Sequence, residues 1–598
     1  MPSVSDYVFE QLSKLGIKHV FMLPGGGAMH LNDSISRNSD INSIICQHEQ
    51  ACGISAEAYG RTDRPNTAKF GVCVVTSGPG STNVITAVAG AWIDSVPLMV
   101  ISGQAKVSDL NYRGKVRQKG VQEVDIISMV ENVTKYSKSL TDPKDTFDVL
   151  QNCINHMLSG RPGPVWLEIP LDIQAREVEC IVEVLLPKKK KASFDFNIVS
   201  DVIRKSQRPL VLAGHGIRLS GAFYNFRNWV EKHNLPVVTT WNALDLLPFD
   251  NKLNIGRPGV VANRAANITI QNADLIIAIG ARIDNVITAY NLEDFGRNAK
   301  LIVVDIDQNE LDEKAELDRL CGINADALDF IEAISDLDFC QKSEKWLASC
   351  VELKSIFSEE NEVTAAQKRI SHKDFVRKAS EILPEGANIA TGSSGLAIEF
   401  LYAGFRNKIN QRMFLTSGLG SMGYGLSQAI GISLADRSKP VYLFESDGSL
   451  MLNLQELATV KAYNLPIILI IMNNGGYASI KNTQTNYFNQ RFIGVDRKSG
   501  LWIPDFESVA KAFRIQYFKV KKLSEFNSEV LDSHQVIIDV TLNKTDILAP
   551  KCQATLGKDG KIRSMPLEDL SPLLDLADLS TFLNGKVSMS SIIARSDE

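Results

Sequence analysis

The chain has 598 residues, of which 44% are hydrophobic and 22% are charged, and its formal net charge is −5. This length predicts three or four domains, and the composition is typical of a soluble globular protein. The charge balance gives no indication of nucleic-acid binding, and the 9 cysteines form neither a CxxC pair nor a Cys/His cluster. We therefore expect a cytoplasmic protein with reduced thiols, without a disulfide framework or a zinc site.

The N-terminal part predicts an α/β domain. The segment MPSVSDYVFEQLSKLG lacks the basic start and apolar core of a signal peptide, and its periodicity predicts an amphipathic helix. No apolar run reaches membrane-spanning length, so we expect no membrane contact. Up to about residue 185, helical patterns alternate with the strand-like runs KHVFML, INSIICQ, FGVCVVTS, PLMVISGQ and PVWLEIP. This alternation predicts a parallel sheet with helices on both faces.

The same alternation appears twice more. A second segment contains the strand-like runs PLVLAGHG, PVVTTWN, LIIAIGARI and LIVVDID. A third contains NIATGSS, RMFLTSG, PVYLFES, PIILIIM and QVIIDV. We therefore predict an α/β protein with three doubly wound parallel-sheet domains. The predicted ranges are 1–185, 186–370 including a connector, and 371–570, with a tail of short helical pieces over 571–598.

The third segment carries an acid and an amide after two neighbouring strands. Asp447 follows PVYLFES, a helical stretch LNLQELATVKAY comes next, and Asn474 follows LPIILIIM. Both residues should lie at the sheet edge where ligands bind in open α/β folds. Their oxygens suit Mg²⁺, Gly448 allows close backbone approach, and the Ser449 hydroxyl can donate to a phosphate. Taken singly, these residues fit an ordinary βαβ unit equally well.

Glu49 lies in the first turn of the helical segment QHEQACGISAEAYGR, directly after a strand. An acid in this place is commonly a partner of the helix dipole. Met422 stands among the glycines of GLGSMGYG, where a large apolar residue could simply pack in the core. The loops PGGGAM, TSGPGST and TGSSG also end predicted strands, and each is a weak signal of a binding site by itself.

Taken together, these segments resemble the thiamine diphosphate enzymes. Their diphosphate-anchoring motif is Gly-Asp-Gly, about two dozen residues, and Asn-Asn, and Ser446 stands here where the first Gly is usual. The resemblance implies that Asp447, Asn474 and the main-chain carbonyl of Gly476 hold Mg²⁺. GAWIDSVPLMVISGQ, LQELATV and APKCQATLGKDG place the chain nearest the acetolactate synthase branch, of the large catalytic subunit type.

The resemblance also implies catalytic roles. Glu49 would contact the pyrimidine ring of thiamine diphosphate and favour the imino tautomer, whose 4′ nitrogen removes the thiazolium C2 proton. Met422 would be the wedge that bends the cofactor, and Gln122 would help to position the intermediate. Further residues implied to contact the cofactor are Gly26, Gly27, Thr76, Pro79, Gly80, Asn83, Gly392, Ser393, Ser394, Gly420, Gly448, Ser449, Tyr477 and Ala478.

Three features of the acetolactate synthase acceptor pocket are missing. Val121 replaces the Phe of a Phe-Gln-Glu segment, Val286 replaces the Arg of Phe-Asp-Asp-Arg, and Thr483 aligns with a Trp that follows Asn-Asn. Loss of the Arg removes the natural partner of a carboxylate, and loss of two aromatic residues enlarges the pocket. We therefore predict a carbonyl acceptor bulkier than a 2-oxo acid, such as a nucleotide-linked keto-sugar.

The predicted function is a carboligase that decarboxylates a 2-oxo acid, foremost pyruvate, and transfers the acyl unit. The open alternatives are an acetolactate synthase acting on two pyruvates, a decarboxylase that releases aldehyde, and a non-catalytic relative. The resemblance implies a homodimer or homotetramer with its site between two subunits. The middle segment also resembles a flavin-binding domain through residues 210–218, 256–266 and 280–284, with bound FAD or a purely structural domain as alternatives.

Overall fold

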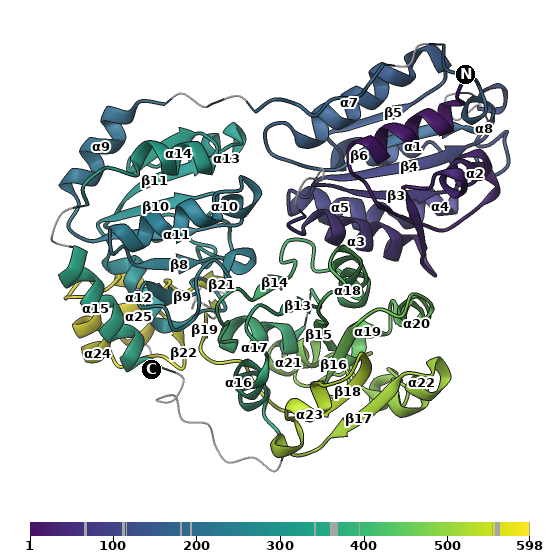
Figure 1. Cartoon of the computed structure of the whole chain (residues 1–598). Coiled ribbons are helices and arrows are strands. Elements are labelled where there is room, and N and C mark those ends of the chain that lie inside the picture. Colours follow the sequence, from purple (N-terminus) through teal and green to yellow (C-terminus); the bar gives the residue numbers. More distant parts are fainter. Residues whose placement is uncertain are drawn as a thin grey trace. The chain divides into compact units, whose positions relative to one another are not determined.

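The computed structural model describes residues 1–64, 69–110, 114, 116–179, 182–189, 191, 194–339, 343–358, 369–393, 395–552, 554–556 and 562–596. The chain divides into two compact units (Figure 1). Unit 1 comprises Met1–Lys189, Ala387–Ile398 and Phe414–Leu542, and unit 2 comprises Lys190–Gly386, Glu399–Met413 and Asn543–Glu598. Three six-stranded parallel sheets with flanking helices confirm the predicted α/β fold.

The first sheet lies in unit 1 and has the strand order β2-β1-β3-β4-β6-β5. Its strands are β1 (His19–Met22), β2 (Asn42–Ile45), β3 (Gly71–Val75), β4 (Leu98–Gln104), β5 (Tyr136–Ser139) and β6 (Val165–Pro170). The helices of this region are α1 (Val4–Lys14), α2 (Met29–Arg37), α3 (Glu49–Gly60), α4 (Pro79–Asn83), α5 (Ile85–Ile93), α6 (Ile126–Val130), α7 (Thr146–Leu158) and α8 (Leu171–Gln174). Every residue of β3 and β4 is buried, as expected for apolar strands covered on both faces.

The third sheet, most of it in unit 1, has the strand order β14-β13-β15-β16-β18-β17. Its strands are β13 (Asn388–Thr391), β14 (Arg412–Phe414), β15 (Val441–Ser446), β16 (Ile467–Asn473), β17 (Gln516–Val520) and β18 (Gln535–Thr541). Its helices are α17 (Leu396–Gly404), α18 (Tyr424–Ala435), α19 (Asp447–Leu450), α20 (Leu457–Ala462), α21 (Ala478–Tyr487), α22 (Phe506–Phe513) and α23 (Ser528–Leu531). These bounds place Asp447 directly after β15 and Asn474 directly after β16.

One hydrophobic core joins the first and third sheets, because α3 packs against α18. The Ser55 hydroxyl donates to the Ser427 carbonyl at 2.7 Å. Gly431 permits the close approach, since a Cβ there would lie 2.1 Å from the Ser55 carbonyl oxygen. The Tyr424 hydroxyl donates to Glu57, which also pairs with the buried Arg61. Helices that follow the second strand in chain order of each sheet therefore meet within unit 1.

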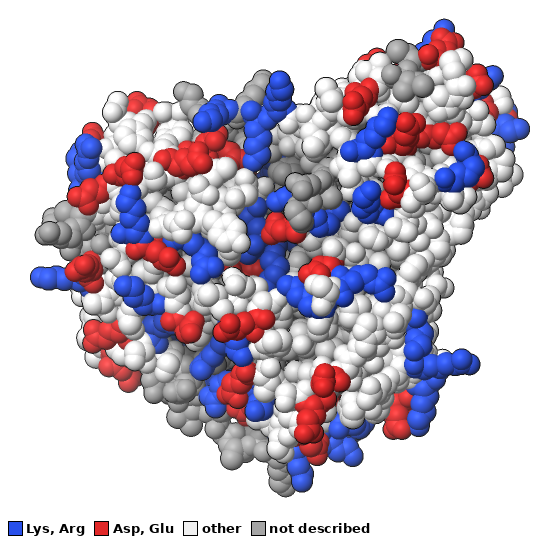
Figure 2. Space-filling view, viewed as in Figure 1, with Lys and Arg blue, Asp and Glu red and all other residues white. Residues whose placement is uncertain are grey.

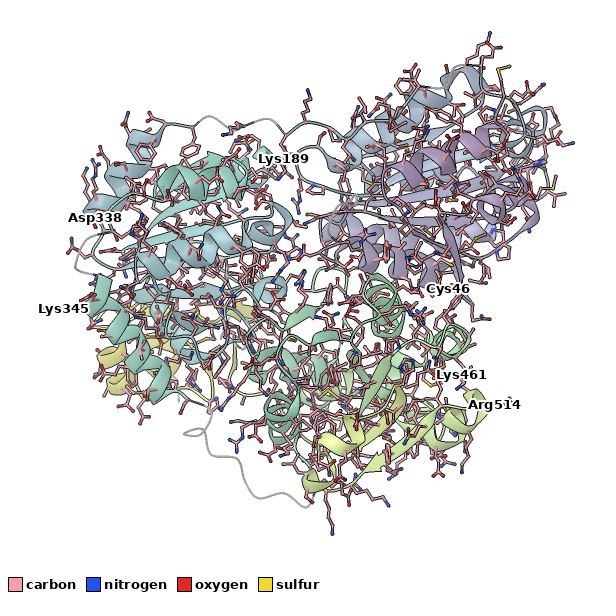
Figure 3. All side chains as sticks on the ribbon, viewed as in Figure 1. Cys46, Lys189, Asp338, Lys345, Lys461 and Arg514 are labelled. Carbon is pink, nitrogen blue, oxygen red and sulfur yellow. The ribbon has the colours of Figure 1, made fainter. Side chains whose placement is uncertain are left out.

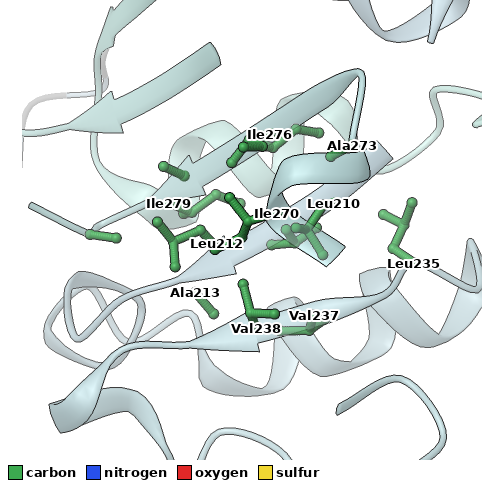
Figure 4. Packing of buried hydrophobic residues seen from close by; sticks show 14 of the residues in the cluster. Leu210, Leu212, Ala213, Leu235, Val237, Val238, Ile270, Ala273, Ile276 and Ile279 are labelled. Carbon is green, nitrogen blue, oxygen red and sulfur yellow. The ribbon is translucent and has the colours of Figure 1, made fainter. Parts of the chain in front are cut away.

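The central sheet lies in unit 2 and has the strand order β12-β11-β10-β7-β8-β9. Its strands are β7 (Pro209–Ala213), β8 (Val237–Thr239), β9 (Asn254–Gly256), β10 (Leu275–Ile279), β11 (Lys300–Asp305) and β12 (Leu320–Asn324). Figure 4 shows Leu210, Leu212 and Ile276 of this sheet packed with Ile270 and Val238. The helices of this unit are α9 (Phe196–Lys205), α10 (Gly216–Leu219), α11 (Phe223–Lys232), α12 (Arg264–Asn272), α13 (Gln308–Asp312), α14 (Ala327–Ile334), α15 (Ser343–Ile356) and α16 (His372–Ile382).

The C-terminal part of the chain folds onto unit 2. Two helices, α24 (Leu576–Phe582) and α25 (Met589–Ser596), follow the two-stranded pairings of β19 (Lys551–Cys552) with β22 (Leu570–Ser571) and of β20 (Ala554–Leu556) with β21 (Ile562–Ser564). Leu579 and Leu583 belong to the same hydrophobic core as the central sheet. The expected tail of short helical pieces is thus packed against the central unit.

The surface is mixed in charge, and Lys, Arg, Asp and Glu side chains are interspersed on the face shown in Figure 2. Within the described part of the chain, no helix combines the length and the apolar character needed to cross a membrane. The seven described cysteines are free thiols: Cys46, Cys52, Cys73, Cys153, Cys321, Cys350 and Cys552.

Candidate active site

Asp447 is fully buried at the carboxyl end of β15. Its Oδ2 accepts the N–H groups of Gly475 at 2.7 Å and Gly476 at 3.0 Å, and its Oδ1 accepts the N–H of Gly448 at 2.8 Å. Burial raises the pKa of Asp447 from 3.8 to about 7, although these N–H groups lower it. The carboxylate thus ties the turn after β15 to the turn after β16.

Asn474 and Gly476 belong to the turn that this carboxylate holds, because Asp447 accepts the two consecutive N–H groups that follow Asn474. Asn474 is buried, and Gly476 has a φ of 139°, which a residue with a side chain would adopt only under strain. The Gly476 carbonyl accepts the N–H of Ala478 at 3.1 Å. The ring of Tyr477 packs over Gly448, where a Cβ would lie 2.4 Å from the Tyr477 Cε1 atom. The structure therefore places the Asp447 carboxylate against the turn that carries Asn474 and Gly476, and their role as metal ligands stays a prediction.

The loop with Met422 is tied to the same turn. The Gly423 N–H donates to the Ser449 hydroxyl at 2.9 Å, and the Ser393 hydroxyl donates to the Ser421 carbonyl. Met422 is half-buried. Gly420 has a φ of 69° and Gly423 has a φ of 76°, which lets the loop turn sharply before α18.

Sequence reasoning missed Glu445, which lies beneath these loops. This fully buried carboxyl accepts the Ser446 N–H and the Gly425 N–H, both at 3.0 Å. A Cβ at Gly392 would lie 2.2 Å from its Oε1 and a Cβ at Gly425 would lie 2.4 Å from its Oε2. An acid inside the apolar strand VYLFES was the available signal. Gly392 and Gly425 thus make room for the carboxyl that lies between the TGSSG loop, the Met422 loop and the turn with Asp447. The predicted Ser394 lies outside the described residues.

Glu49 is the first residue of α3 and is 8% exposed. The Asn83 amide donates to its Oε2 at 3.0 Å, which holds the carboxyl toward the turn that begins at Pro79. A Cβ at Gly80 would lie 3.7 Å from its Oε1. The predicted residues Glu49, Asn83 and Gly80 therefore form one group at the edge of the first sheet.

The neighbouring loop with Gly26 and Gly27 is close-packed against the same edge. The Gly27 N–H donates to the Thr76 hydroxyl at 3.1 Å, and a Cβ at Gly27 would lie 2.4 Å from the Ser77 hydroxyl. Gly26 has open space where a side chain would project, since no atom lies within 4 Å of an ideal Cβ. This edge therefore leaves room beside the predicted contact residues.

Gln122 lies against the same group of loops. Its backbone has a φ of 59°, and its carbonyl oxygen lies 2.8 Å from the position of a Cβ at Gly78. The Ser77 hydroxyl is 3.4 Å from its Oε1. The carboxylate of Glu123 accepts the N–H groups of Lys119 at 2.6 Å and Gly120 at 2.8 Å, which shapes the turn that presents Gln122.

The three predicted acceptor-pocket residues are exposed or partly exposed. Val121 is 88% exposed, Val286 is 36% exposed, and Thr483 on α21 is exposed. Val121 and Thr483 belong to unit 1, whereas Val286 belongs to unit 2. The acceptor-side assignment of these residues stays a prediction.

Two of the three predicted flavin segments, residues 210–218 and 280–284, meet at the carboxyl edge of the central sheet. The N–H of Gly214 donates to the Ile279 carbonyl and the N–H of Gly216 donates to the Gly280 carbonyl, both at 3.0 Å. A Cβ at Gly214 would lie 2.0 Å from the Gly280 oxygen, so the turn after β7 is closed against β10. Donors of this kind hold the pyrophosphate in dinucleotide folds, and here they are used internally. The N–H groups of this turn are therefore not available to a pyrophosphate, and bound FAD stays a prediction.

Comparison with known proteins identifies the class that this fold and site define. Three models of the thiamine pyrophosphate enzymes match the chain: the N-terminal TPP binding domain at residues 2–129, the central domain at 197–334 and the C-terminal TPP binding domain at 391–538. The first and third of these ranges contain Glu49 and Asp447, respectively. The chain belongs to the thiamine pyrophosphate enzymes.

Its relatives include acetolactate synthases. The acetolactate synthase large subunit of Lactococcus lactis is 30% identical over 94% of this chain and 96% of its own length. The isozyme 1 large subunit of Escherichia coli is 32% identical over 81% of this chain and 84% of its own length. The probable large subunit of Methanocaldococcus jannaschii is 27% identical over 97% of this chain and 100% of its own length. The chain is thus an acetolactate synthase-like enzyme that depends on thiamine diphosphate and Mg²⁺.

The residues present fit a magnesium-bound diphosphate. Within the described ranges, no three His, Cys, Asp or Glu side chains gather as a metal site. The site at β15 and β16 instead offers one carboxylate, one amide and a main-chain carbonyl. This small set of hard oxygen donors leaves positions for water and phosphate oxygens, as Mg²⁺ prefers.

Proposed function

We propose that the chain is a carboligase that decarboxylates pyruvate or a similar small 2-oxo acid and transfers the acyl unit to a carbonyl acceptor. The observation that carries this proposal is the buried Asp447 carboxylate, held by the N–H groups of Gly475 and Gly476 beside Asn474. Asp447, Asn474 and the Gly476 carbonyl would hold Mg²⁺, and Gly448 and Ser449 would contact the diphosphate.

When bound, thiamine diphosphate supplies a carbon nucleophile and an electron sink for decarboxylation. Glu49 would hold a proton at the pyrimidine ring, with its carboxyl oriented by the Asn83 amide at 3.0 Å. Met422 would set the bent shape of the cofactor, and Gln122 would orient the bound acid from its fixed turn. Residues Gly26, Gly27, Thr76, Pro79 and Gly80 would contact the ring, and Gly392, Ser393, Gly420, Tyr477 and Ala478 would complete the diphosphate side.

For the acceptor, we propose a carbonyl compound bulkier than a 2-oxo acid. Val286 cannot pair with a carboxylate as an Arg would, and the aliphatic Val121 and the short Thr483 leave more room than aromatic residues. The second candidate is an acetolactate synthase, which the names of the relatives favour. We also propose that the enzyme works in the cytoplasm as a homodimer or homotetramer, with Glu49 of one copy serving the cofactor of another.

Product analysis separates these candidates. The purified chain is incubated with thiamine diphosphate, Mg²⁺ and pyruvate, with and without a nucleotide-linked keto-sugar, and Glu49→Gln serves as the matched control. Carbon dioxide release with acyl transfer to the sugar supports the proposal. Abundant acetolactate from pyruvate alone would refute the bulky acceptor, release of free aldehyde would indicate a decarboxylase, and absence of turnover would refute the carboligase. The visible absorbance of the purified protein tests for FAD.

A further inference from the structure

Glu456 lies where the segment after Asp447 meets the start of the Glu49 helix. It is fully buried, and its Oε1 accepts the N–H of Gln47 at 2.9 Å. The Thr459 hydroxyl donates to its other oxygen at 2.7 Å. Both oxygens of the carboxyl are therefore held, one by the chain that enters α3 and one by its own helical segment.

Neighbouring residues of the same segment bind the same piece of chain. The Tyr463 hydroxyl accepts the N–H of Ile45 at 2.7 Å, and the Asn453 amide donates to the Gln50 side chain at 3.1 Å. Figure 3 labels Cys46, which stands between Ile45 and Gln47, and Lys461 of α20 in this region. The segment from Asn453 to Tyr463 therefore binds the backbone that precedes Glu49 and the side chain of Gln50, which follows it.

The segment also reaches the predicted diphosphate side. The Asn453 amide donates to the Gly423 carbonyl at 2.8 Å, directly after Met422. The Gly423 N–H donates to Ser449, two residues after Asp447. One stretch of chain thus connects the predicted metal ligand, the Met422 loop and the entry to α3.

We propose that Glu456 is a positioning residue that fixes the entry to α3 and thereby the place of the Glu49 carboxyl. Gln47 directly precedes His48, the N-cap residue of α3, so the bond to Glu456 fixes the chain where it enters the helix. A carboxylate near the start of a helix also interacts favourably with the helix dipole. Without this acceptor, the Gln47 N–H would need a new partner and the first turn of α3 would shift. A small displacement of a catalytic group is enough to lower a rate strongly. This role rests on the proposed function of Glu49.

The proposal is tested in the full chain with Glu456→Ala, Glu456→Gln and the control Lys461→Ala, an exposed position on α20, the helix that Glu456 precedes. Hydrogen exchange of the apoprotein should show the Gln47 amide about tenfold less protected in Glu456→Ala and unchanged in the control. In the loaded enzyme, kcat should fall on the order of 10- to 100-fold in Glu456→Ala, while the cofactor Kd changes less than about threefold. Glu456→Gln keeps an acceptor oxygen and should restore both values.

Unchanged exchange and unchanged kcat in Glu456→Ala would overturn the proposal. Equal losses in kcat and cofactor affinity would also overturn it, as would a Glu456→Gln variant as slow as Glu456→Ala. If Glu456→Ala does not fold, Thr459→Val removes one of the two hydrogen bonds to the carboxyl and should show the same pattern at smaller size. A wild-type chain without carbon dioxide release would refute the proposed function, whereas the exchange measurement would still decide the positioning role.

Discussion

The first and third sheets share one topology but carry different chemistry. Counted from the first strand of each sheet, the order β2-β1-β3-β4-β6-β5 is the same as β14-β13-β15-β16-β18-β17, whereas the central sheet is ordered differently. The helix after the second strand in chain order is α3 in the first sheet and α18 in the third, and these two helices pack against each other. The two sheets therefore present equivalent strand ends, and their side chains can be compared position by position.

The likeness extends to a pair of polar side chains. Glu168 is opposite Ser102, two residues before the end of β4, and Asp539 is opposite Ile471, two residues before the end of β16. The amide of Gln104 donates to Glu168 at 2.8 Å, and the amide of Asn473 donates to Asp539 at 2.9 Å. The same acid and amide pairing thus recurs in both sheets.

The difference lies at the predicted metal site. Because Val75 is opposite Ser102 and Glu445 is opposite Ile471, Asp447 corresponds to Ser77. By the same register Asn474 corresponds to Ala105. The first sheet offers a hydroxyl and a methyl group where the third offers a carboxylate and an amide. Topology fixes where the strand ends lie, and these two positions distinguish the end that is predicted to bind Mg²⁺.

Substitution of Asp447 should have the largest effect. Asp447→Ala removes the carboxylate and frees the N–H groups of Gly475 and Gly476, so Mg²⁺-dependent binding of thiamine diphosphate should be lost. Ser77→Ala at the equivalent position should keep the Mg²⁺ dependence. Calorimetric titration with and without Mg²⁺ measures both. Equal loss of Mg²⁺-dependent cofactor binding in the two variants would show that the metal site is not specific to the third sheet.

Substitution of Glu49 should affect chemistry more than binding. Glu49→Gln keeps the shape and the hydrogen bond from Asn83 but cannot exchange a proton, so proton exchange at the cofactor C2 should slow by about 10²- to 10⁴-fold. The cofactor Kd should change little. NMR of C2 exchange and calorimetric titration provide the two values, and normal exchange in this variant would remove Glu49 from the reaction.

Glu168 should make the stability of the first sheet depend on pH. Burial raises its pKa from 4.5 to about 7, although the amide of Gln104 lowers it, and Asp125 raises it further. The stabilisation that the protonated Glu168 carboxyl contributes is complete below pH 4.5 and is lost as the pH rises through 7. Glu168→Gln avoids this loss, so its advantage over wild type should grow by up to about 3 kcal/mol between about pH 4.5 and pH 8. Urea unfolding at both pH values measures it, and a constant difference would contradict the assignment.

The contact between the two sheets should be sensitive to one methyl group. Gly431→Ala places a Cβ against the Ser55 backbone, so unit 1 should lose about 1–3 kcal/mol of stability. In Gly322→Ala the nearest atoms are 3.6 Å away, and this strand position should tolerate the change. Denaturant unfolding of the two variants gives the comparison. Equal stability of the two variants would mean that the contact between α3 and α18 does not require a glycine at position 431.

Most of the fold was predictable because its central strands are short apolar runs followed by polar loops. In the three six-stranded sheets, four strands were missed: β5, β9, β12 and β17. In two of them, β5 and β17, buried and exposed residues do not alternate, and most residues are exposed or half-buried. These strands are at sheet edges, where only one neighbour and little burial select the sequence. Apolar periodicity is therefore a weak signal for them.

The residues of the candidate site that follow strands were predictable, whereas the buried acids that support them were not. Asp447, Asn474 and Glu49 stand at strand ends, where an acid or amide is visible in sequence. Glu445 and Glu456 act through contacts with residues far away in the chain, such as the Gln47 N–H. No spacing rule reveals such partners, because they depend on how α3 and α18 pack. An acid within an apolar strand or buried helix was the only local sign.

The central claim is that the third sheet holds the metal and the first sheet supplies the acid. A crystal structure with thiamine diphosphate and Mn²⁺ in place of Mg²⁺, analysed by anomalous scattering, tests it directly. We expect the anomalous peak beside Asp447 and Asn474 and the pyrimidine ring beside a Glu49 carboxyl. A peak at Ser77, or a ring far from every Glu49, would contradict the account.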